Sequence, residues 1–129
     1  MALRLSLKPG ERVIIGGSVV RNGDGRTSLV VENTVPVLRE SDILSPRKVR
    51  TPCQRIYLAL QLMYIQPQQL GRHLATYDIL VSEVVAAAPS CQKFIRRINI
   101  LLGREEYYRA LKVAGELIQH ERKLMSHVQ

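Results

Sequence analysis

The spacing of apolar residues changes once along this chain, near residue 45, and this change limits the folds open to it. Before that point apolar residues recur at every second position, as in Leu3, Leu5 and Leu7, which is typical of half-buried β-strands. After residue 51 they recur every three or four positions, as in Ile56 and Leu60, which is typical of amphipathic helices. The sequence therefore predicts an α+β chain, with a small five-stranded antiparallel β unit followed by a three- or four-helix C-terminal part.

The β unit divides into five short apolar runs separated by turn-forming residues. Asn22–Gly25 reads Asn-Gly-Asp-Gly, and these residue types tolerate positive φ angles. We therefore expect a tight hairpin there that joins the run before it to the run after it. Because so few short strands bury little apolar surface, we expect helices or a second copy to cover the unit. The five runs are residues 3–7, 13–15, 18–21, 29–31 and 35–38.

The segment Ser45–Arg50, "SPRKVR", separates the two patterns. It is polar and basic and contains proline, which is typical of a linker. We assign residues 1–46 to the β unit, as the candidate RNA-binding surface, and residues 51–129 to a helical domain.

Helix signals are regular after the linker. Thr51 predicts an N-cap, and Pro52 suits the first helical position, where its missing N–H costs nothing. Pro67, Pro89 and Gly103 predict the breaks between successive helices, because proline cannot continue a helix and glycine weakens one.

The chain is strongly basic, with a formal net charge of +8 over 129 residues. The excess is even, since residues 1–50 and residues 51–129 each carry +4. A surplus of this size favours partners with negative charge, which are nucleic acids, anionic membrane surfaces and acidic proteins. A basic surface without any dedicated partner would carry the same charge. The charge therefore indicates which classes of partner are favoured, but it does not show that a partner exists.

Catalytic motifs are missing from the sequence. His73, His120 and His127 do not have the spacing of metal ligands, and no nucleophile elbow, phosphate-binding loop or paired-cysteine motif occurs. The sequence therefore predicts no enzyme, no cofactor and no bound metal. No apolar run is long enough for a membrane span, and the first residues lack the apolar core of a secretory signal. We expect a cytoplasmic protein without a membrane partner.

Basic residues on the β unit are the remaining candidates for function. The β unit contains no aromatic residue, which argues against a base-stacking platform for RNA. Guanidinium groups bind phosphate through two parallel hydrogen bonds and also stack on bases. Ordinary solvent-facing residues of half-exposed strands would give the same pattern. The candidates are Arg4, Lys8, Arg12 and Arg39 in the β unit, with Arg47, Lys48 and Arg50 in the linker as a second possible RNA-binding set.

Four blocks of sequence carry a resemblance to a known family. In order along the chain they read "LRLSLKPGERVIIGGSVVRNGDGRTSLVVEN", "VLRESDILSP", "TPCQRIYLALQLMY" and "REEYYRALKVAGELIQHE". They resemble the FlbT proteins of bacterial flagellum biosynthesis. The resemblance implies a post-transcriptional regulator that associates with the 5′ untranslated region of flagellin mRNA and promotes its degradation. In some bacteria the family acts positively instead.

A second, shorter resemblance covers the β unit alone. The run "GERVIIG" at residues 10–16, followed by "VLRE", is similar to the CsrA family of RNA-binding translational regulators. Those small five-stranded proteins pair by exchanging strands and hold RNA near the end of strand one and at the V-x-R-E motif. The resemblance implies Lys8, Val37 and Arg39 as RNA contacts. Leu7 departs from the pattern, because the family carries a basic residue there.

Two functions follow as hypotheses. In the first, the protein is a post-transcriptional regulator of flagellin expression that acts as a repressor, and its partner is the flagellin mRNA leader. In the second, it is a protein-interaction adaptor whose helices bind flagellin or another flagellar regulator, and RNA association is indirect. Ile79 and Leu80 favour the second, because they lie off the main apolar stripe of their helix. We also expect a homodimer or larger homo-oligomer.

Overall fold

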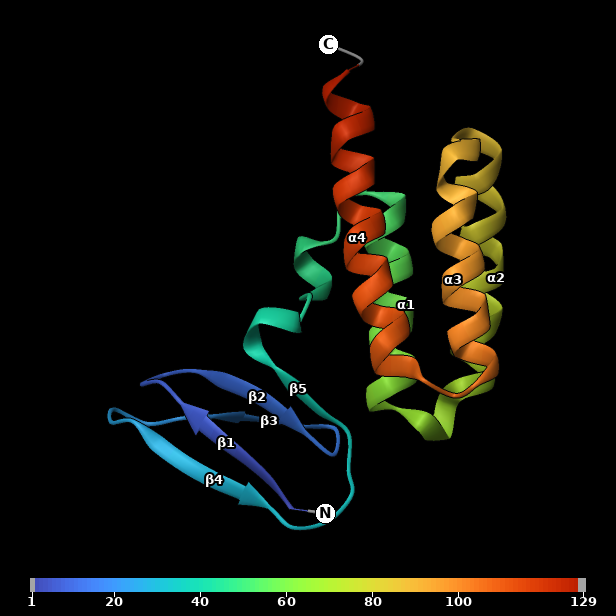
Figure 1. Cartoon of the computed structure of the whole chain (residues 1–129). Helices are drawn as coiled ribbons and strands as arrows, with labels where there is room; N and C mark the ends of the chain where they lie inside the picture. The colour runs from blue at the N-terminus through green and yellow to red at the C-terminus, as the bar shows by residue number, and fades with distance from the viewer. Residues whose placement is uncertain (1, 128–129) are drawn as a thin grey trace. The chain divides into compact units, whose positions relative to one another are not determined.

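The computed structural model describes residues 2–127 and divides into two compact units. The first is Met1–Ile43 and the second is Leu44–Gln129. All five strands lie in the first unit and all four α-helices lie in the second (Figure 1). This confirms the α+β class predicted from the change in apolar spacing.

The β unit contains two small antiparallel sheets. One sheet pairs β1 with β4, and the other has the order β3-β2-β5. The predicted set of five antiparallel strands is confirmed. The strands are β1 (Leu3–Leu7), β2 (Arg12–Ile15), β3 (Ser18–Arg21), β4 (Thr27–Val31) and β5 (Val37–Arg39).

Alternation of side chains along the strands builds the core of this unit. Leu5 and Leu7 of β1 and Val13 of β2 are buried and belong to one cluster. Because side chains alternate between the two faces of a strand, Arg4 and Ser6 lie on the opposite face of β1 and are exposed. The partly buried residues packed against the cluster are Ile15, Val20, Leu29, Val31 and Val37.

The predicted hairpin at Asn22–Gly25 is wrong. β3 pairs with β2, and β4 pairs with β1, so the strands on either side of Asn22–Gly25 belong to different sheets. The tight hairpin is instead at Gly16-Gly17, whose φ angles of 56° and 91° suit glycine. The Asn22 side-chain amide donates to the carbonyls of Lys8 (2.7 Å) and Gly25 (2.9 Å). Asn22 therefore fastens its segment to the end of β1 instead of turning a hairpin.

The helical unit contains four α-helices joined by short turns. Proline opens the turns before α2 and α3, and Gly103 is the last residue of α3. The predicted breaks at Pro67, Pro89 and Gly103 are therefore confirmed. The helices are α1 (Pro52–Ile65), α2 (Leu70–Ala87), α3 (Gln92–Gly103) and α4 (Tyr107–Ser126), and the short 3₁₀ turns are η1 (Glu40–Asp42), η2 (Pro46–Lys48), η3 (Pro67–Gln69) and η4 (Pro89–Cys91).

The first helix begins with a capping box. The Thr51 hydroxyl accepts from the backbone N–H of Gln54 at 3.2 Å, and the Gln54 side chain accepts from the N–H of Thr51 at 3.2 Å. The predicted N-cap at Thr51 is confirmed. Each residue satisfies a backbone donor that the helix itself leaves without a partner.

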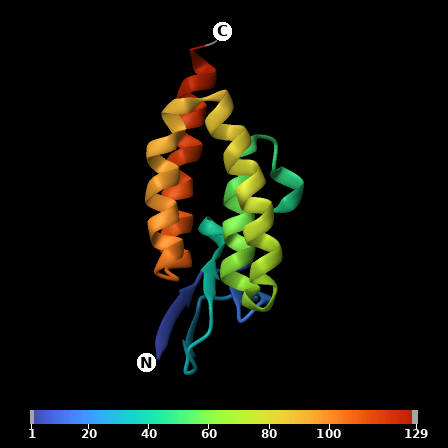
Figure 2. The same ribbon diagram turned by 90° about the vertical axis from the view of Figure 1, so that its right-hand side faces the viewer.

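Packing of the helices follows their apolar stripes. α1 packs against both α2 and α4, and α3 packs against α4. Both views of the ribbon show these helices side by side (Figure 1 and Figure 2). Within residues 2–127, no helix combines the length and apolar character needed to span a bilayer. The buried stripe residues include Ile56, Leu60 and Met63 of α1, Tyr77 and Val84 of α2, Ile95 and Ile98 of α3, and Leu111, Ala114 and Leu117 of α4.

A buried glutamine fixes the entry to the helical unit. Gln61 lies in α1, and its amide oxygen accepts from the N–H of Leu44 at 2.8 Å. Its amide nitrogen donates to the carbonyl of Leu44 at 3.1 Å. Both polar atoms of a buried side chain are thereby satisfied, and Leu44, the first residue of the helical unit, is bound to α1.

The connection from α3 to α4 places a charged residue in an unusual conformation. The N–H of Glu106 donates to Leu101 and the N–H of Glu105 donates to Leu102, which is the hydrogen-bond pattern of a Schellman motif. The residue with positive φ in this motif is Glu105, at 58°. Glycine usually occupies that position, and here Gly103 lies two residues earlier.

Candidate nucleic-acid interface

Three of the predicted RNA-binding residues lie at one end of the β unit. Lys8 follows β1, Arg12 begins β2 and Arg39 ends β5. Antiparallel pairing of β2 with β5 sets Val13 opposite Arg39, so the start of β2 adjoins the end of β5. Sheet pairing therefore gathers side chains that are far apart in sequence.

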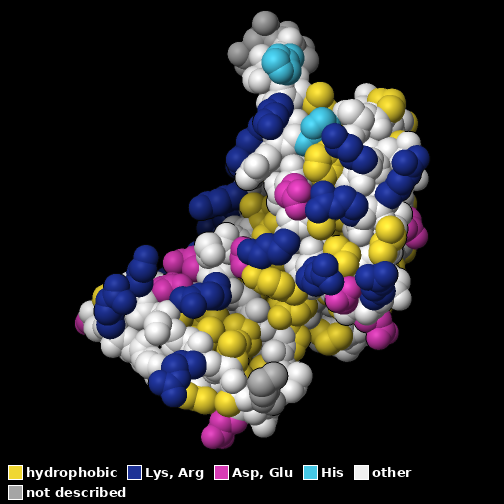
Figure 3. Space-filling view, viewed as in Figure 1, with side chains coloured by type: hydrophobic (Ala, Val, Ile, Leu, Met, Phe, Trp, Pro, Cys, Tyr) yellow, Lys and Arg dark blue, Asp and Glu magenta, His cyan; other side chains and the backbone are white. Residues whose placement is uncertain are grey.

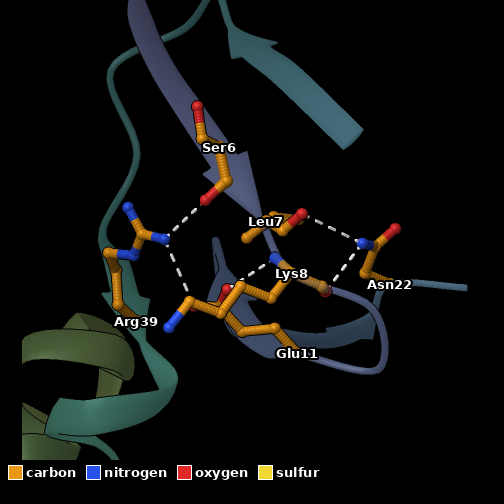
Figure 4. A network of polar contacts seen from close by, with 6 residues as sticks. All are labelled: Ser6, Leu7, Lys8, Glu11, Asn22 and Arg39. Carbon is orange, nitrogen blue, oxygen red and sulfur yellow. Dashed lines mark hydrogen bonds and ion pairs between the residues drawn. The ribbon is translucent and has the colours of Figure 1, made fainter. Parts of the chain in front are cut away.

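The Arg39 guanidinium links the two sheets of the β unit (Figure 4). Its Nη2 donates to the backbone carbonyl of Ser6 in β1 at 2.6 Å and to Glu11 Oε2 at 3.2 Å. The side chain nevertheless remains 43% exposed. Arg39 is therefore both a structural tie and a cation that solvent and ligands can reach.

The Glu11 carboxylate organises this end of the unit. Its Oε1 accepts from the backbone N–H of Lys8 at 2.9 Å, and its Oε2 pairs with Arg39. The hydrogen bond from the Lys8 backbone, followed by the one from Arg39, lowers the pKa of Glu11 below its usual value. Glu11 is therefore charged at neutral pH and holds Arg39 in place.

Arg12 is exposed at the start of β2, between a carboxylate and another arginine. Its Nε pairs with Glu40 Oε1 at 3.4 Å, an exposed and therefore weak ion pair. On its other side the β2–β3 register sets Arg12 directly opposite Arg21. Like charges in directly opposed positions destabilise a sheet, and an anion bound between them would relieve the repulsion.

Arg21 is a candidate residue that sequence reasoning missed. It is exposed, and its only link to the predicted set is its cross-strand position opposite Arg12. The expected hairpin would have paired Arg21's strand with β4, so the sequence held no signal for this pairing. We call Lys8, Arg12, Arg21 and Arg39 the basic end of the β unit.

Arg4 and the Val37 side chain do not join the basic end. Arg4 is exposed on β1 opposite Val30 of β4, in the other sheet. The Val37 side chain packs against the core cluster of the β unit. Arg4 therefore lies apart from the basic end, in the other sheet, and Val37 is partly buried against the core.

The predicted linker residues lie in the helical unit. Arg47 and Lys48 are exposed on the turn η2. The Arg50 guanidinium donates to the carbonyls of Arg47 at 2.6 Å and Val49 at 3.0 Å. Arg50 therefore closes the linker turn, whereas Arg47 and Lys48 present their charges to solvent.

The basic end offers charge and hydrogen bonds, and residues 2–43 of the β unit include no aromatic side chain. Its four cations are only partly offset by Glu11 and Glu40, so a phosphate group would be attracted there. Lysine and arginine side chains also appear elsewhere on the visible face of both units (Figure 3). Across residues 2–127, no three His, Cys, Asp or Glu side chains are grouped so as to hold a metal ion.

Comparison with known proteins gives matches over nearly the whole of this chain. The profile of the family "Flagellar protein FlbT" matches residues 3–125. "Probable flagellum biosynthesis repressor protein FlbT 1" of Bradyrhizobium diazoefficiens is 47% identical over 125 residues, which cover 96% of this chain and 85% of that protein. No solved structure matches.

Two further relatives are similar over more than nine-tenths of their length. "Probable flagellum biosynthesis repressor protein FlbT" of Rhodopseudomonas palustris is 37% identical over 126 residues, covering 98% of this chain and 99% of that protein. "Flagellum biosynthesis repressor protein FlbT" of Caulobacter vibrioides is 37% identical over 131 residues, covering 99% and 92%. The resemblance to the FlbT proteins is thereby confirmed, and the chain belongs to the FlbT family of flagellar proteins.

Proposed function

We propose that this chain represses flagellum biosynthesis after transcription, by binding the 5′ untranslated region of flagellin mRNA in the cytoplasm. The observation that carries the proposal is the basic end of the β unit, where sheet pairing gathers Arg12, Arg21 and Arg39 and where Glu11 links Lys8 to Arg39. The relatives also support the proposal, because they are named flagellum biosynthesis repressors.

The chemistry of the basic end suits a single-stranded leader. Arg12 and Arg21 stand side by side on one face, so one phosphate could accept from both guanidinium groups. Arg39 remains partly exposed, so RNA can reach it. Because Glu11 already holds its side chain, Arg39 would lose little conformational entropy on binding. Exposed backbone groups beside these side chains could then read unpaired bases.

Repression by this route requires no catalysis by the chain itself. A bound leader would either be hidden from the ribosome or be held in a form that a cellular nuclease can cut. The amount of flagellin made would fall in both cases.

A titration of the purified full-length chain against RNA tests this function. The probes are a fluorescent flagellin leader and a scrambled RNA of the same length, each at about 50 mM and 200 mM salt. We expect the leader to bind at least about tenfold more tightly than the scrambled RNA at both salt concentrations, since base-reading contacts survive salt better than phosphate contacts. Equal affinity for the two RNAs, or binding of neither, would contradict the proposal.

A further inference from the structure

A groove runs along the helical unit between α1 and α2. Its volume is about 540 Å³. Leu58 and Leu62 of α1 and Leu80 of α2 give it an apolar floor, and each of these side chains is only half-buried. Arg55 and Arg72 also line it. The groove shares no residue with the basic end, since all its residues belong to the helical unit.

The groove follows one face of each helix for about three turns. On this side it is lined by Arg55, Leu58, Ala59 and Leu62 of α1 and by the C-cap residue Gln66, which together span twelve positions at helical spacing. At 1.5 Å per residue this is roughly 16 Å of helix. These residues are not the stripe that α1 buries in the bundle core, which is formed by Ile56, Leu60 and Met63. The groove therefore uses a second apolar face, of the length that a docked helix of three turns would cover.

A positive charge stands at each end of this groove. α1 and α2 lie side by side and run in opposite directions (Figure 2). Arg55, near the start of α1, therefore lies toward the end of the groove that contains Leu80, and Arg72 lies toward the end of α1. No carboxylate lines the groove, and neither arginine takes part in an ion pair among the described residues.

The floor of the groove is fixed by a buried polar pair. His73 of α2 is buried, and its Nε2 lies 3.0 Å from the side-chain oxygen of Gln66 at the end of α1. This bond joins the two helices at the Arg72 end. A preformed groove loses little freedom when a ligand enters it, which favours binding.

We propose that the groove between α1 and α2 binds an amphipathic helix of a partner protein. The helix presents a leucine-like stripe about three turns long, with an aspartate or glutamate near each end of the stripe. Half-exposed leucines supply the apolar contact, and Arg55 and Arg72 supply the complementary charge. This inference goes beyond RNA binding and does not depend on it.

A pair of synthetic peptides tests the inference on the full-length chain. The first is a fluorescent alanine-based helix with leucines at four-residue spacing and a glutamate at each end of the stripe. The second has lysine in place of both glutamates. We expect the chain to bind the glutamate peptide at least about tenfold more tightly than the lysine peptide at low salt. The double variant Arg55→Glu, Arg72→Glu should reverse this preference.

A matched variant controls for overall charge. Arg96 and Arg122 are exposed and lie outside the groove, so Arg96→Glu with Arg122→Glu gives the same change in net charge and should keep the preference for the glutamate peptide. If the reversed groove variant fails to fold, Arg55→Gln with Arg72→Gln must still lose most of the preference. In an NMR titration the peptide should shift the backbone amides of Leu58, Leu62 and Leu80.

Several results would overturn the inference. These are absence of binding by the glutamate peptide, equal affinity for the two peptides, an equal effect of the Arg96 and Arg122 substitutions, and amide shifts confined to other helices. Displacement of the peptide by leader RNA, together with loss of RNA affinity in the groove variant, would make the groove a nucleic-acid site and would also overturn it.

Discussion

Arg39 has two roles that sequence reasoning could not separate. The V-x-R-E resemblance pointed to this residue as an RNA contact, and its exposed fraction of 43% leaves that role open. Its hydrogen bonds to the Ser6 carbonyl and to Glu11 depend on the packing of two sheets, and no local pattern in the sequence encodes that packing.

We expect Arg39→Ala to lower the free energy of unfolding by about 1 kcal/mol. This is below the range of about 1.5–3 kcal/mol for hydrogen bonds to charged groups, because the side chain is partly solvated. Denaturant unfolding of the full-length chain measures the effect. Arg4→Ala is the control, since Arg4 is exposed on β1. Equal stability of the two variants would contradict the structural role of Arg39.

Glu11 makes the β unit sensitive to acid. Its pKa is lower in the folded chain than in the unfolded chain, so at acidic pH the unfolded state binds more protons. Its contribution to stability is therefore fully present above the usual glutamate pKa of about 4.3 and is lost as the pH falls through the lowered folded value. Glu11→Gln should flatten the fall in stability in that acidic window. An unchanged pH profile would exclude this role for Glu11.

At the scale of elements, the sequence predicted which segments are strands and helices but not how the strands pair. Alternating leucines, prolines and the Thr51 cap act locally, and their predictions are confirmed. Asn22–Gly25 has the composition of a hairpin turn, yet the Asn22 side chain binds the end of β1 instead. Arg21 was not predicted as a site residue for the same reason, because its place opposite Arg12 depends on the pairing of β2 with β3. The groove could not be predicted from the sequence either, because it forms only when α1 and α2 pack together.

We expect Glu105→Gly to stabilise the chain. Glu105 has a φ of 58°, a conformation that costs a residue with a side chain roughly 1 kcal/mol and costs glycine little. The substitution should raise the free energy of unfolding by about that amount in a denaturant titration. Glu105→Ala keeps a Cβ in the same conformation and is the control. A gain shared equally by both variants would assign the effect to the lost charge.

At the scale of the whole molecule, the β unit leaves apolar residues uncovered. Val30 of β4 is 53% exposed, and Leu3 at the start of β1 is 45% exposed. β1 is also paired on one side only. An uncovered strand with apolar neighbours favours pairing with a second chain.

We therefore expect a homodimer, with twice the chain mass of 14.6 kDa, in light scattering at micromolar concentration. Val30→Glu should shift the protein toward the monomer, and it should fold because Arg4 lies directly opposite. Ile79→Glu changes an exposed apolar residue of α2 and should leave the mass unchanged. The mass of a single chain at every concentration would contradict the predicted homodimer.

The measurement that tests the central claim most directly is the affinity of the double variant Arg12→Gln, Arg21→Gln for the flagellin leader RNA. Because this variant removes a repulsive pair, its stability should stay the same or rise, so that lost affinity would not reflect unfolding. We predict a dissociation constant raised by about tenfold or more, since charged hydrogen bonds contribute about 1–3 kcal/mol each. Arg96→Gln with Arg122→Gln, which removes the same charge from exposed helical positions, should raise it less than about threefold. Unchanged affinity in the first variant, or equal losses in both, would contradict RNA recognition by the basic end.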